Sequence, residues 1–438
     1  MKIKELIEAT GAKVHGVIDE NIDVNISTDT RTIQRGDFYL PLKGVSFDGE
    51  KFIEQAIEKG AVGAFCTNSE NKCGYLLEVE DTLQAYLKLA NWRRRKLDFK
   101  VVAITGSSGK TTTKELVAST LSAKFKTFKT PLNHNNEIGL CQTIFEASDD
   151  TEVLVLEMGM RGLGEIEVLS KCSEPDITII SNVGTAHIGR LGSRENIAKA
   201  KCEIVKYQRG DLFIAHNDDL IKQTVEFGGE KIFYSIKDIK ILEKNKNFSK
   251  FEYQNHTYEL NVGGDYNIEN ALAAINVGIK LGMTNDEIAN GLKQYKPIEK
   301  RWESVNAGGY EIINDSYNAN PESMRAFVDT IFELYDNYVI VLGAMGELGE
   351  NEVYYHKGLG QYINSHKLLP NNVQILSVGA LAKNITNEIT KVYSKNFDAV
   401  EDVVKYIKSE IKSSSKIFLK ASRSEKFERI IEILNNAL

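Results

Sequence analysis

The run GSSGKTTT, which begins at Gly106, contains the side chains that a phosphate-binding loop needs. Glycines let backbone N–H groups converge on phosphate, a lysine reaches the terminal phosphates, and a hydroxyl binds Mg²⁺. Gly106, Gly109, Lys110 and Thr111 are placed for these roles. The strict pattern has a glycine where this chain has Ile104, so spacing alone would reject the loop. A tight turn before a helix is the alternative, but the strand-like VVAIT in front favours nucleotide binding.

A carboxylate and a histidine stand where they could complete a magnesium–nucleotide site. Glu157 ends the strand-like run EVLVLE, and His187 follows the strand-like run DITIISNV. The carboxyl ends of parallel strands meet at one sheet edge, where such sheets bind ligands. Each residue alone is more often structural, but together with the loop they predict contacts with metal or phosphate. The chain has no Asn-Lys-x-Asp run, which argues against guanine recognition.

These residues need parallel strands to position them, and the chain has the corresponding pattern. From Val101 onward, strand-like and helix-like segments alternate, and a second alternating series begins near Pro297. Such alternation predicts right-handed βαβ units and parallel sheets. Residues 250–262 alternate polar and apolar with period two, which predicts a β-ribbon appended to the first sheet. We predict an α/β fold with three domains: a small mixed α/β domain (1–82), a central phosphate-loop domain with a parallel sheet (83–297), and a C-terminal Rossmann-like domain (298–438).

Composition limits the partners of the chain. A formal net charge of −7 over 438 residues lacks the basic surface that nucleic acid attracts, so small molecules are the expected partners. No run approaches the ~18 apolar residues of a membrane span, and we see no signal-peptide pattern at the N-terminus. The five cysteines form no CxxC pair, which indicates free thiols in a reducing compartment. These features predict a cytoplasmic protein.

Longer runs around these motifs resemble the ATP-dependent Mur ligases of peptidoglycan synthesis. The runs are TGSSGKTTTKE, KTPLNHNNEIG, LEMGMRGLGEI, SNVGTAHIGRLGSRENIAKAKCEI and NDSYNANPESM, and the resemblance covers the whole chain. This family has a shortened glycine loop, so the absence of a glycine at Ile104 is consistent with the resemblance. Within the family, the runs are most similar to those of the branch that adds D-alanyl-D-alanine to UDP-N-acetylmuramoyl-tripeptide. The resemblance implies an enzyme that uses ATP and Mg²⁺ to activate the tripeptide carboxylate as an acyl phosphate. We expect it to be a monomer.

The resemblance also implies which residues act in catalysis. Lys110 would hold the β- and γ-phosphates, Thr111 and Glu157 would hold one Mg²⁺, and His187 would approach a second. Lys201 matches a lysine that related enzymes carbamylate into a magnesium ligand, with Lys199 the weaker candidate. Two solvated lysines on an exposed helix face remain the alternative. The predicted catalytic residues are Lys110, Glu157, His187 and Lys201, and the predicted metal ligands are Thr111, Glu157, His187 and Lys201.

Further residues are assigned to the nucleotide and the substrates by the same resemblance. The predicted nucleotide contacts are Gly106, Ser107, Ser108, Gly109, Lys110, Thr111, Thr112, Asn267, Asn270, Arg301 and Asp315. The predicted substrate contacts are Asp29, Thr30, Arg31, Ser46, Phe47, Asp48, Gly49, Asn135, Asn136 and Glu137. Since Lys110 and Arg301 would lie on different domains, we expect the domains to close over ATP.

Four positions depart from the family pattern and bear on the UDP and dipeptide pockets rather than on the reaction class. They are Glu50, Leu132, Ala344 and Ala421, where the family commonly has histidine, glycine, an acidic residue and glycine. The nearest alternative function is another Mur-type ligase or a folylpolyglutamate synthase. A silent nucleotide or UDP-sugar sensor and a generic small-molecule kinase are alternatives from other classes.

Overall fold

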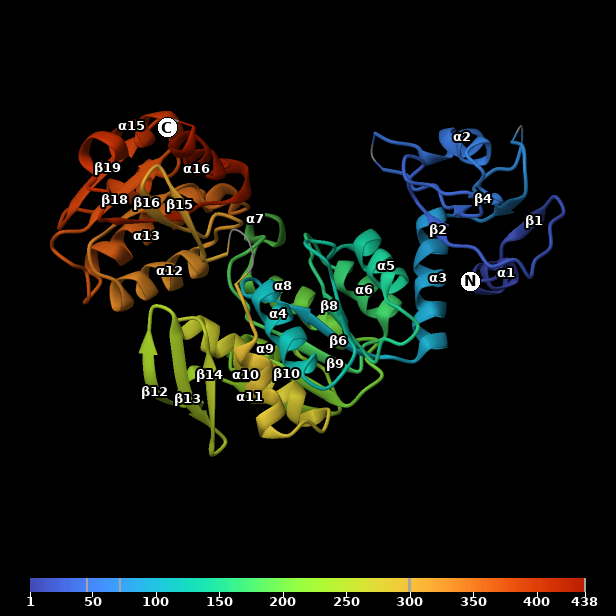
Figure 1. Ribbon diagram of the computed structural model, residues 1–438, viewed down its shortest axis with the longest axis horizontal. Helices are drawn as coiled ribbons and strands as arrows, with labels where there is room; N and C mark the ends of the chain where they lie inside the picture. Colours follow the sequence, from blue (N-terminus) through green and yellow to red (C-terminus); the bar gives the residue numbers. More distant parts are fainter. Residues whose placement is uncertain (45, 71, 298–300, 437–438) are drawn as a thin grey trace.

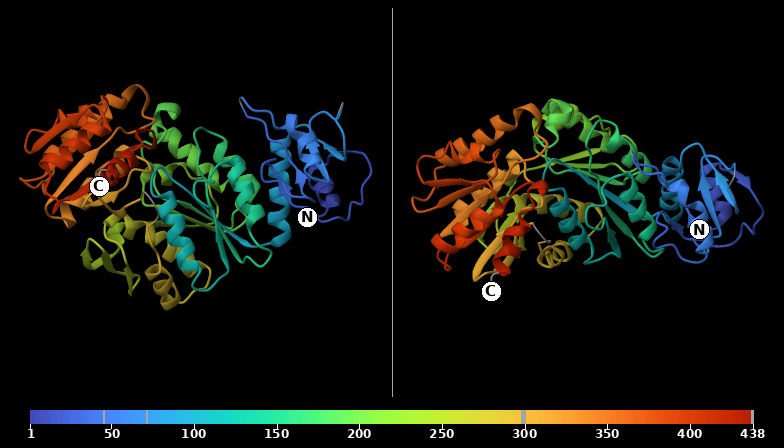
Figure 2. Two further views of the ribbon diagram at one scale, coloured as in Figure 1. Left: turned by 45° about the horizontal axis from the view of Figure 1, so that its top comes forward. Right: turned by 90° about the horizontal axis from the view of Figure 1, so that it is seen from above.

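The computed structural model describes residues 1–438 except residues 45, 71, 298–300 and 437–438. It has the predicted α/β fold with three domains, arranged in a row (Figure 1). The N-terminal and C-terminal domains lie at opposite ends of the central domain in each view (Figure 2). The predicted boundary at residue 298 lies outside the described residues.

The N-terminal domain is built on a five-stranded sheet in the order β1-β5-β4-β3-β2. Only the β1–β5 pair is antiparallel. Its elements are α1 (Ile3–Thr10), β1 (Lys13–His15), β2 (Ile26–Ser27), β3 (Phe38–Tyr39), η1 (Gly49–Phe52), α2 (Ile53–Glu58), β4 (Gly63–Cys66) and β5 (Leu76–Glu78). Helix α3 (Thr82–Leu97) then leads into the central domain, where it packs against α5 (Glu137–Glu146) and α6 (Glu165–Ser173). The Asp81 side chain caps this helix by accepting a hydrogen bond from the backbone of Gln84.

The central domain has a six-stranded sheet in the order β11-β10-β9-β6-β8-β7, and every pair in it is parallel. Its strands are β6 (Lys100–Thr105), β7 (Thr127–Lys129), β8 (Val153–Glu157), β9 (Ile177–Ile180), β10 (Leu212–His216) and β11 (Glu230–Tyr234). The register places Ile104 beside Glu157 and Thr105 beside Ile180. The segments that follow β6, β8 and β9 therefore emerge at one edge of the sheet.

Helices cover both faces of this sheet, and its apolar strands divide between two core clusters. The helices are α4 (Lys110–Leu121), α5 (Glu137–Glu146), α6 (Glu165–Ser173), α7 (Ile188–Leu191), α8 (Arg194–Cys202), which η2 (Glu203–Val205) extends, α9 (Asp219–Thr224), α10 (Asp265–Lys280) and α11 (Asn285–Lys293). Helix α10 packs along α4, the helix that follows the phosphate loop. This contact lets residues of α10 approach the loop.

The ribbon predicted at residues 250–262 forms, but its predicted attachment to the central sheet is wrong. Strands β13 (Phe248–Tyr253) and β14 (His256–Leu260) join β12 (Lys240–Asn245), after η3 (Ile236–Asp238), in a separate antiparallel sheet. This sheet lies beside the C-terminal domain (Figure 1), and Lys244 forms an ion pair with Glu333 of that domain. Alternation alone does not show which edge a ribbon joins.

The C-terminal domain has a six-stranded sheet in the order β15-β16-β20-β17-β18-β19, parallel except for the β15–β16 pair. Its strands are β15 (Glu303–Ala307), β16 (Tyr310–Asn314), β17 (Tyr338–Leu342), β18 (Gln374–Val378), β19 (Tyr393–Phe397) and β20 (Lys416–Lys420). Its helices are α12 (Pro321–Leu334), η4 (Gly349–Asn351), α13 (Glu352–Ser365), α14 (Lys383–Thr386), α15 (Val400–Glu410), η5 (Arg423–Glu425) and α16 (Glu428–Asn435). As the sequence predicts, Asn320 caps α12 and Pro321 is its first residue.

Within the described residues, every helix is too short or too polar to cross a membrane.

Candidate functional site

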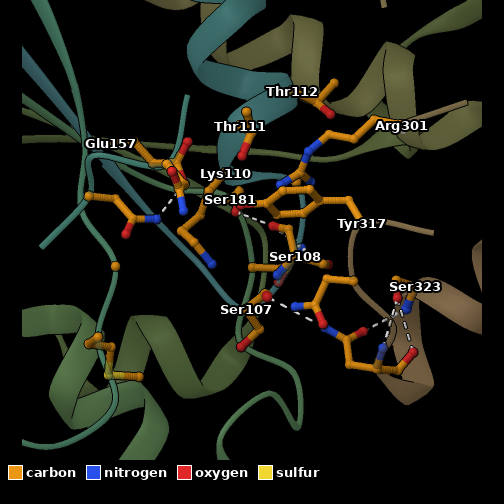
Figure 3. Close-up of a pocket in the computed structure, with 18 of the residues that line it drawn as sticks. Ser107, Ser108, Lys110, Thr111, Thr112, Glu157, Ser181, Arg301, Tyr317 and Ser323 are labelled. Carbon is orange, nitrogen blue, oxygen red and sulfur yellow. Dashed lines mark hydrogen bonds between the residues drawn. The ribbon is translucent and has the colours of Figure 1, made fainter. Parts of the chain in front are cut away.

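A cavity of about 840 Å³ lies between the central and C-terminal domains. It opens over the carboxyl ends of β6, β8 and β9, where a parallel sheet binds its ligands. The structure brings fifteen of the predicted site residues to its wall: Ser107, Ser108, Gly109, Lys110, Thr111, Thr112, Asn135, Asn136, Glu137, Glu157, His187, Asn267, Asn270, Arg301 and Asp315. Figure 3 shows Lys110 and Glu157 on one side of it and Arg301 with Tyr317 on the other.

Two glycines allow the tight course of the phosphate loop. Gly106 has a φ of 155°, and a Cβ atom there would lie 1.9 Å from Oγ of Ser181. Gly109, the N-cap of α4, has a φ of 76°, and a Cβ atom there would lie 2.8 Å from Oδ1 of Asn270. Side chains at these positions would therefore clash, and left-handed φ values favour glycine. The loop delivers the N-terminus of α4, with its free N–H groups, to the cavity.

The residues that follow β9 form hydrogen bonds with the phosphate loop. Ser181 donates a hydrogen bond of 2.6 Å to the Ser108 carbonyl, and Asn182 accepts one of 3.0 Å from the Ser108 amide. The backbone of Gly184 donates to the Ser107 hydroxyl over 2.9 Å. Sequence reasoning did not assign these residues, although the run SNVG after the strand marks their place. They hold the loop rigid before any ligand binds.

Two lysines lie close to each other at the loop. Lys110 donates a hydrogen bond of 2.7 Å to the Gly106 carbonyl, and burial lowers the pKa of its ammonium. Lys201 is 1% exposed on α8, and no hydrogen bond or ion pair within the described chain reaches its ammonium. Burial and then the charge of Lys110 hold the pKa of Lys201 well below its usual range. The alternative that both lysines are solvated on an exposed helix face is therefore wrong for Lys201. Lys199 is exposed.

Glu157 presents a carboxylate oxygen that no hydrogen bond satisfies. Its Oε1 accepts a 2.9 Å hydrogen bond from Asn135, while its Oε2 is buried without one. Lys114 is the nearest cation at 3.9 Å, but that ammonium donates to the Thr130 carbonyl. A buried, unsatisfied carboxylate oxygen beside the hydroxyl-bearing Thr111 fits a hard cation such as Mg²⁺. No group of three His, Cys, Asp or Glu side chains suited to a metal occurs among the described residues, so phosphate and water would complete the coordination.

His187 connects the two domains. It has a left-handed φ of 66°, and its Nδ1 lies 2.6 Å from Oε2 of Glu347 in the C-terminal domain. A second contact joins the domains nearby, where the Glu322 carboxylate accepts hydrogen bonds of 3.0 Å from the backbone and the hydroxyl of Thr185. Neither glutamate was predicted, because no local pattern marks a contact between distant segments.

The two asparagines of α10 line the cavity at the loop, as predicted. The helix begins at Asp265 after the N-cap Gly264, so Asn267 lies within its first turn. Asn267 instead donates to the Gly263 carbonyl over 2.7 Å, and Asn270 accepts a hydrogen bond of 3.1 Å from the Thr113 hydroxyl. Both side chains are buried at the junction of α10 and α4.

The C-terminal domain contributes an aromatic and charged wall. The Arg301 guanidinium lies 4.2 Å from the centre of the Tyr317 ring, in the range of a cation–π contact (Figure 3). Asp315 accepts a hydrogen bond of 2.5 Å from the buried Lys420. Tyr317 and Lys420 were not assigned from the sequence, although both lie in the runs NDSYNAN and LKASRS. This wall offers a flat ring and two charges to a ligand in the cavity.

The predicted substrate residues fall into two groups. Asn135, Asn136 and Glu137 line the cavity, and Asn136 caps α5 by accepting a hydrogen bond from the Gly139 backbone. The seven predicted residues of the N-terminal domain do not line this cavity. These seven are Asp29, Thr30, Arg31, Ser46, Phe47, Asp48 and Gly49. Helix α3 reaches the cavity instead, through Leu83, Gln84 and Leu87.

The N-terminal residues make contacts within their own domain. Arg31 donates to the Asp29 carboxylate, which lowers the pKa of Asp29 to about 2. Phe47 is 55% exposed and stacks on Phe52 with 5.7 Å between the ring centres. The departure at Glu50 is embedded in polar contacts: burial would raise the pKa of Glu50, but hydrogen bonds from Lys72, Thr67 and Lys43 lower it to about 2.

The Thr30 hydroxyl donates to the Gln55 side chain over 3.3 Å, and the Asp48 side chain caps η1. Gly49 is buried against Leu42, and Ser46 is exposed next to Phe47. The role of these seven residues in substrate binding stays a prediction.

Comparisons with known proteins cover the whole chain. Three family models match: the Mur ligase family catalytic domain over residues 24–91, the Mur ligase middle domain over 104–278, and the glutamate ligase domain of Mur ligases over 300–423. A UDP-N-acetylmuramoyl-tripeptide–D-alanyl-D-alanine ligase of Bacillus subtilis is 34% identical over 99% of this chain and 97% of its own length. Among solved structures, MurF from Acinetobacter baumannii superposes with a TM-score of 0.90 at 29% identity, over 99% of this chain and 98% of its own. MurF ligase from Thermotoga maritima, solved with ADP, has a TM-score of 0.84 at 28% identity, over 95% and 98% of the two chains.

Proposed function

Because the chain belongs to the Mur ligase family, we propose that it is an ATP-dependent ligase that joins D-alanyl-D-alanine to UDP-N-acetylmuramoyl-tripeptide. The observation that carries this proposal is the full-length similarity to relatives that bear this activity in their names. The cavity supports the reaction class, since it joins a phosphate loop, an unsatisfied carboxylate and cationic residues from two domains. The reaction consumes ATP and forms the peptide bond, ADP and phosphate.

The first step transfers the γ-phosphoryl group of ATP to the terminal carboxylate of the tripeptide. Phosphoryl transfer depends on in-line positioning and on neutralising negative charge. The N–H groups of the phosphate loop and the Lys110 ammonium would hold the β- and γ-phosphates. The D-alanyl-D-alanine amine then attacks the acyl phosphate, the new amide bond forms, and phosphate leaves with the bonding electrons of the broken C–O bond.

The proposed metal positions use the candidate donor atoms of the phosphate loop, β8 and the segments after β9. Thr111 and Glu157 would hold one Mg²⁺ through a hydroxyl and the unsatisfied Oε2, and His187 with Lys201 would hold a second. Bound Mg²⁺ would supply charge neutralisation at the phosphates. A lowered pKa leaves a larger neutral fraction of the Lys201 amine, which is the form that adds CO₂ and loses a proton to give a carbamate. This carbamate would be an anionic oxygen ligand for the second metal.

The remaining residues would hold the nucleoside and the substrates. Asn267 and Asn270 offer amide groups to the adenine, Asp315 a carboxylate to the ribose, and Arg301 a cation to the phosphates. The residues Asn135, Asn136 and Glu137 would lie along the tripeptide, and the seven residues of the N-terminal domain would bind the UDP end. A long substrate with its sugar nucleotide at one end and its carboxylate at the other is consistent with two separate surfaces. We further infer an enzyme of the cytoplasm, since all five cysteines are free thiols, and a monomer, as expected above.

A product assay tests the proposal against its alternatives. Purified protein is given ATP, Mg²⁺, D-alanyl-D-alanine and each of two UDP-linked tripeptides, ending in diaminopimelate or in lysine, and products are identified by mass. We expect a UDP-linked pentapeptide and one ADP per product. Phosphate release without the dipeptide would indicate a plain ATPase, and nucleotide binding without turnover would indicate a sensor. Product formation with glutamate and folate instead would assign the chain to folylpolyglutamate synthesis.

A further inference from the structure

The loop after β17 carries Glu347 from the C-terminal domain to His187 of the central domain. Oε2 of the glutamate lies 2.6 Å from Nδ1 of the histidine. This is hydrogen-bond distance between a carboxylate oxygen and a ring nitrogen, and the contact is an ion pair only when the histidine is protonated. Within the described chain, no hydrogen bond reaches Nε2 of the histidine, which leaves that nitrogen available to a ligand.

The backbone around this pair is packed too closely for the contact to be incidental. The Gly189 amide donates a hydrogen bond of 3.1 Å to the Glu347 carbonyl. A Cβ atom on Gly189 would lie 2.5 Å from the backbone nitrogen of Gly349. His187 and Glu347 both have left-handed φ values, 66° and 61°, which cost non-glycine residues free energy and persist where surrounding contacts impose them. The two domains therefore fit each other at this point.

A buried histidine fixes the glutamate loop within the C-terminal domain. His356 is 0% exposed; its Nε2 accepts a 2.9 Å hydrogen bond from the Met345 backbone, and its Nδ1 lies 2.7 Å from the Glu352 carbonyl. A ring that accepts at Nε2 and donates at Nδ1 is neutral, and burial lowers its pKa. Glu347 is thus held in place by its own domain before it meets His187.

We propose that Glu347 is the positioning residue for His187, and that docking of the C-terminal domain and orientation of this histidine are one event. This inference rests on the proposed function, in which His187 faces a metal. A histidine that binds a metal through one ring nitrogen usually has a carboxylate or carbonyl partner at the other, which fixes the ring and raises its basicity. Here that carboxylate comes from a different domain. The second metal position is therefore completed only when the C-terminal domain docks.

The test uses Glu347→Gln, with Glu350→Gln as a matched control. Glu350 lies three positions further along the same segment, is exposed, and has no recorded partner in the described chain. The first readout is Mn²⁺ affinity in the presence of ADP, measured by electron paramagnetic resonance without the peptide substrates. We expect Glu347→Gln to weaken it by about 10- to 100-fold, Glu347→Asp to recover part of the loss, and Glu350→Gln to leave it unchanged.

The second readout is the distance between the domains in protein without metal or nucleotide. Spin labels on cysteines that replace the exposed Lys199 and Lys357 report this distance. Cys73→Ser removes the exposed natural cysteine, which would otherwise also be labelled. We expect a wider distance distribution for Glu347→Gln than for the wild type or Glu350→Gln. The thermal midpoint of each variant is measured as well. If Glu347 had only a structural role, a variant with an unchanged thermal midpoint would also keep its Mn²⁺ affinity.

A double-mutant cycle decides whether Glu347 acts through His187. In a His187→Ala background, Glu347→Gln should change neither Mn²⁺ affinity nor the distance distribution further. Equal Mn²⁺ affinity and equal distances for Glu347→Gln and the wild type would overturn the inference. Because neither readout needs the tripeptide or the dipeptide, a protein that fails the product assay but passes this test would refute the proposed function alone.

Discussion

Replacing Lys201 by methionine should make the protein more stable and inactive at the same time. The Lys201 side chain is 1% exposed, and its ammonium has no recorded partner in the described chain. Leaving a buried polar group without a partner costs about 1–3 kcal/mol. Methionine keeps most of the side-chain volume and removes this cost, so we expect the unfolding free energy of the central domain to rise by about 1–3 kcal/mol at pH 7.

The sign of the pH dependence follows from the lowered pKa. Below the folded-state pKa of Lys201 both states bind the proton, and the folded protein bears the full cost of burying the charge. Between that pKa and the unfolded value of 10.5, only the unfolded chain binds the proton, so the wild type gains stability as pH rises. The advantage of Lys201→Met should therefore be largest at low pH and shrink toward pH 10.5.

Thermal unfolding between pH 6 and pH 10 measures the change in stability. ADP formation that depends on the dipeptide measures the loss of activity. If carbamylated Lys201 is a metal ligand, Lys201→Met should lower kcat by about 100-fold or more, the upper end of the loss expected for supporting residues of a metal site. Lys199→Met, on the exposed face of the same helix, is the control and should change neither quantity. Unchanged turnover in Lys201→Met would refute the ligand role, and a stability difference that does not vary with pH would refute the buried-charge argument. Lys201→Ala should regain some activity with added short carboxylates.

Three further changes test other parts of the structure. Gly106→Ala should abolish ATP binding, measured by calorimetry, because its Cβ atom would lie 1.9 Å from Oγ of Ser181; an intact binding isotherm would contradict the loop geometry. Tyr317→Leu should raise the KM for ATP by about 5- to 30-fold by removing the ring beside Arg301, while Tyr317→Phe should keep it, since a cation–π contact of about 1–2 kcal/mol needs no hydroxyl. Glu50→Gln should lower the thermal midpoint of the N-terminal domain at pH 7. Since the pKa of Glu50 is lowered from 4.5 to about 2, its stabilisation is present above pH 4.5 and lost as pH falls toward 2, so wild type and variant should converge there; a constant difference would count against this explanation.

The parts of the fold and site that depend on local signals were predictable from the sequence. Glycine, lysine and hydroxyl spacing placed the phosphate loop, and alternating apolar runs placed the strands that carry Glu157 and His187 to the same sheet edge. Capping residues placed the start of α12 at Asn320 and Pro321. These signals lie within a few residues of the feature that they predict, so one sequence is enough to read them.

The remaining parts depend on contacts between distant segments. Period-two alternation predicted β13 and β14, but only their pairing with β12 shows that they form a separate sheet. The sequence left two readings of Lys201 open, because the burial of α8 depends on helices packed around it. Tyr317 lines the cavity from the C-terminal domain and Glu347 contacts His187 from the same domain, and no local sequence pattern predicts either contact. The sequence therefore predicts the loop better than it predicts the wall that faces it.

The segment from Asn182 to Gly189 explains how one short run can serve both domains. At its start, Asn182 and Gly184 form hydrogen bonds with the phosphate loop. At its end, Thr185 and Gly189 donate hydrogen bonds to Glu322 and Glu347 of the C-terminal domain. The contacts with the phosphate loop and with the C-terminal domain therefore lie within one run of eight residues. A Cβ atom on Gly189 would lie 2.5 Å from the Gly349 backbone nitrogen, so that position requires glycine; a Cβ atom on Gly184 would lie 2.6 Å from the Glu322 carboxyl carbon and would displace that side chain. This short run therefore makes so many contacts because it takes part in two interfaces, one with the phosphate loop and one with the C-terminal domain.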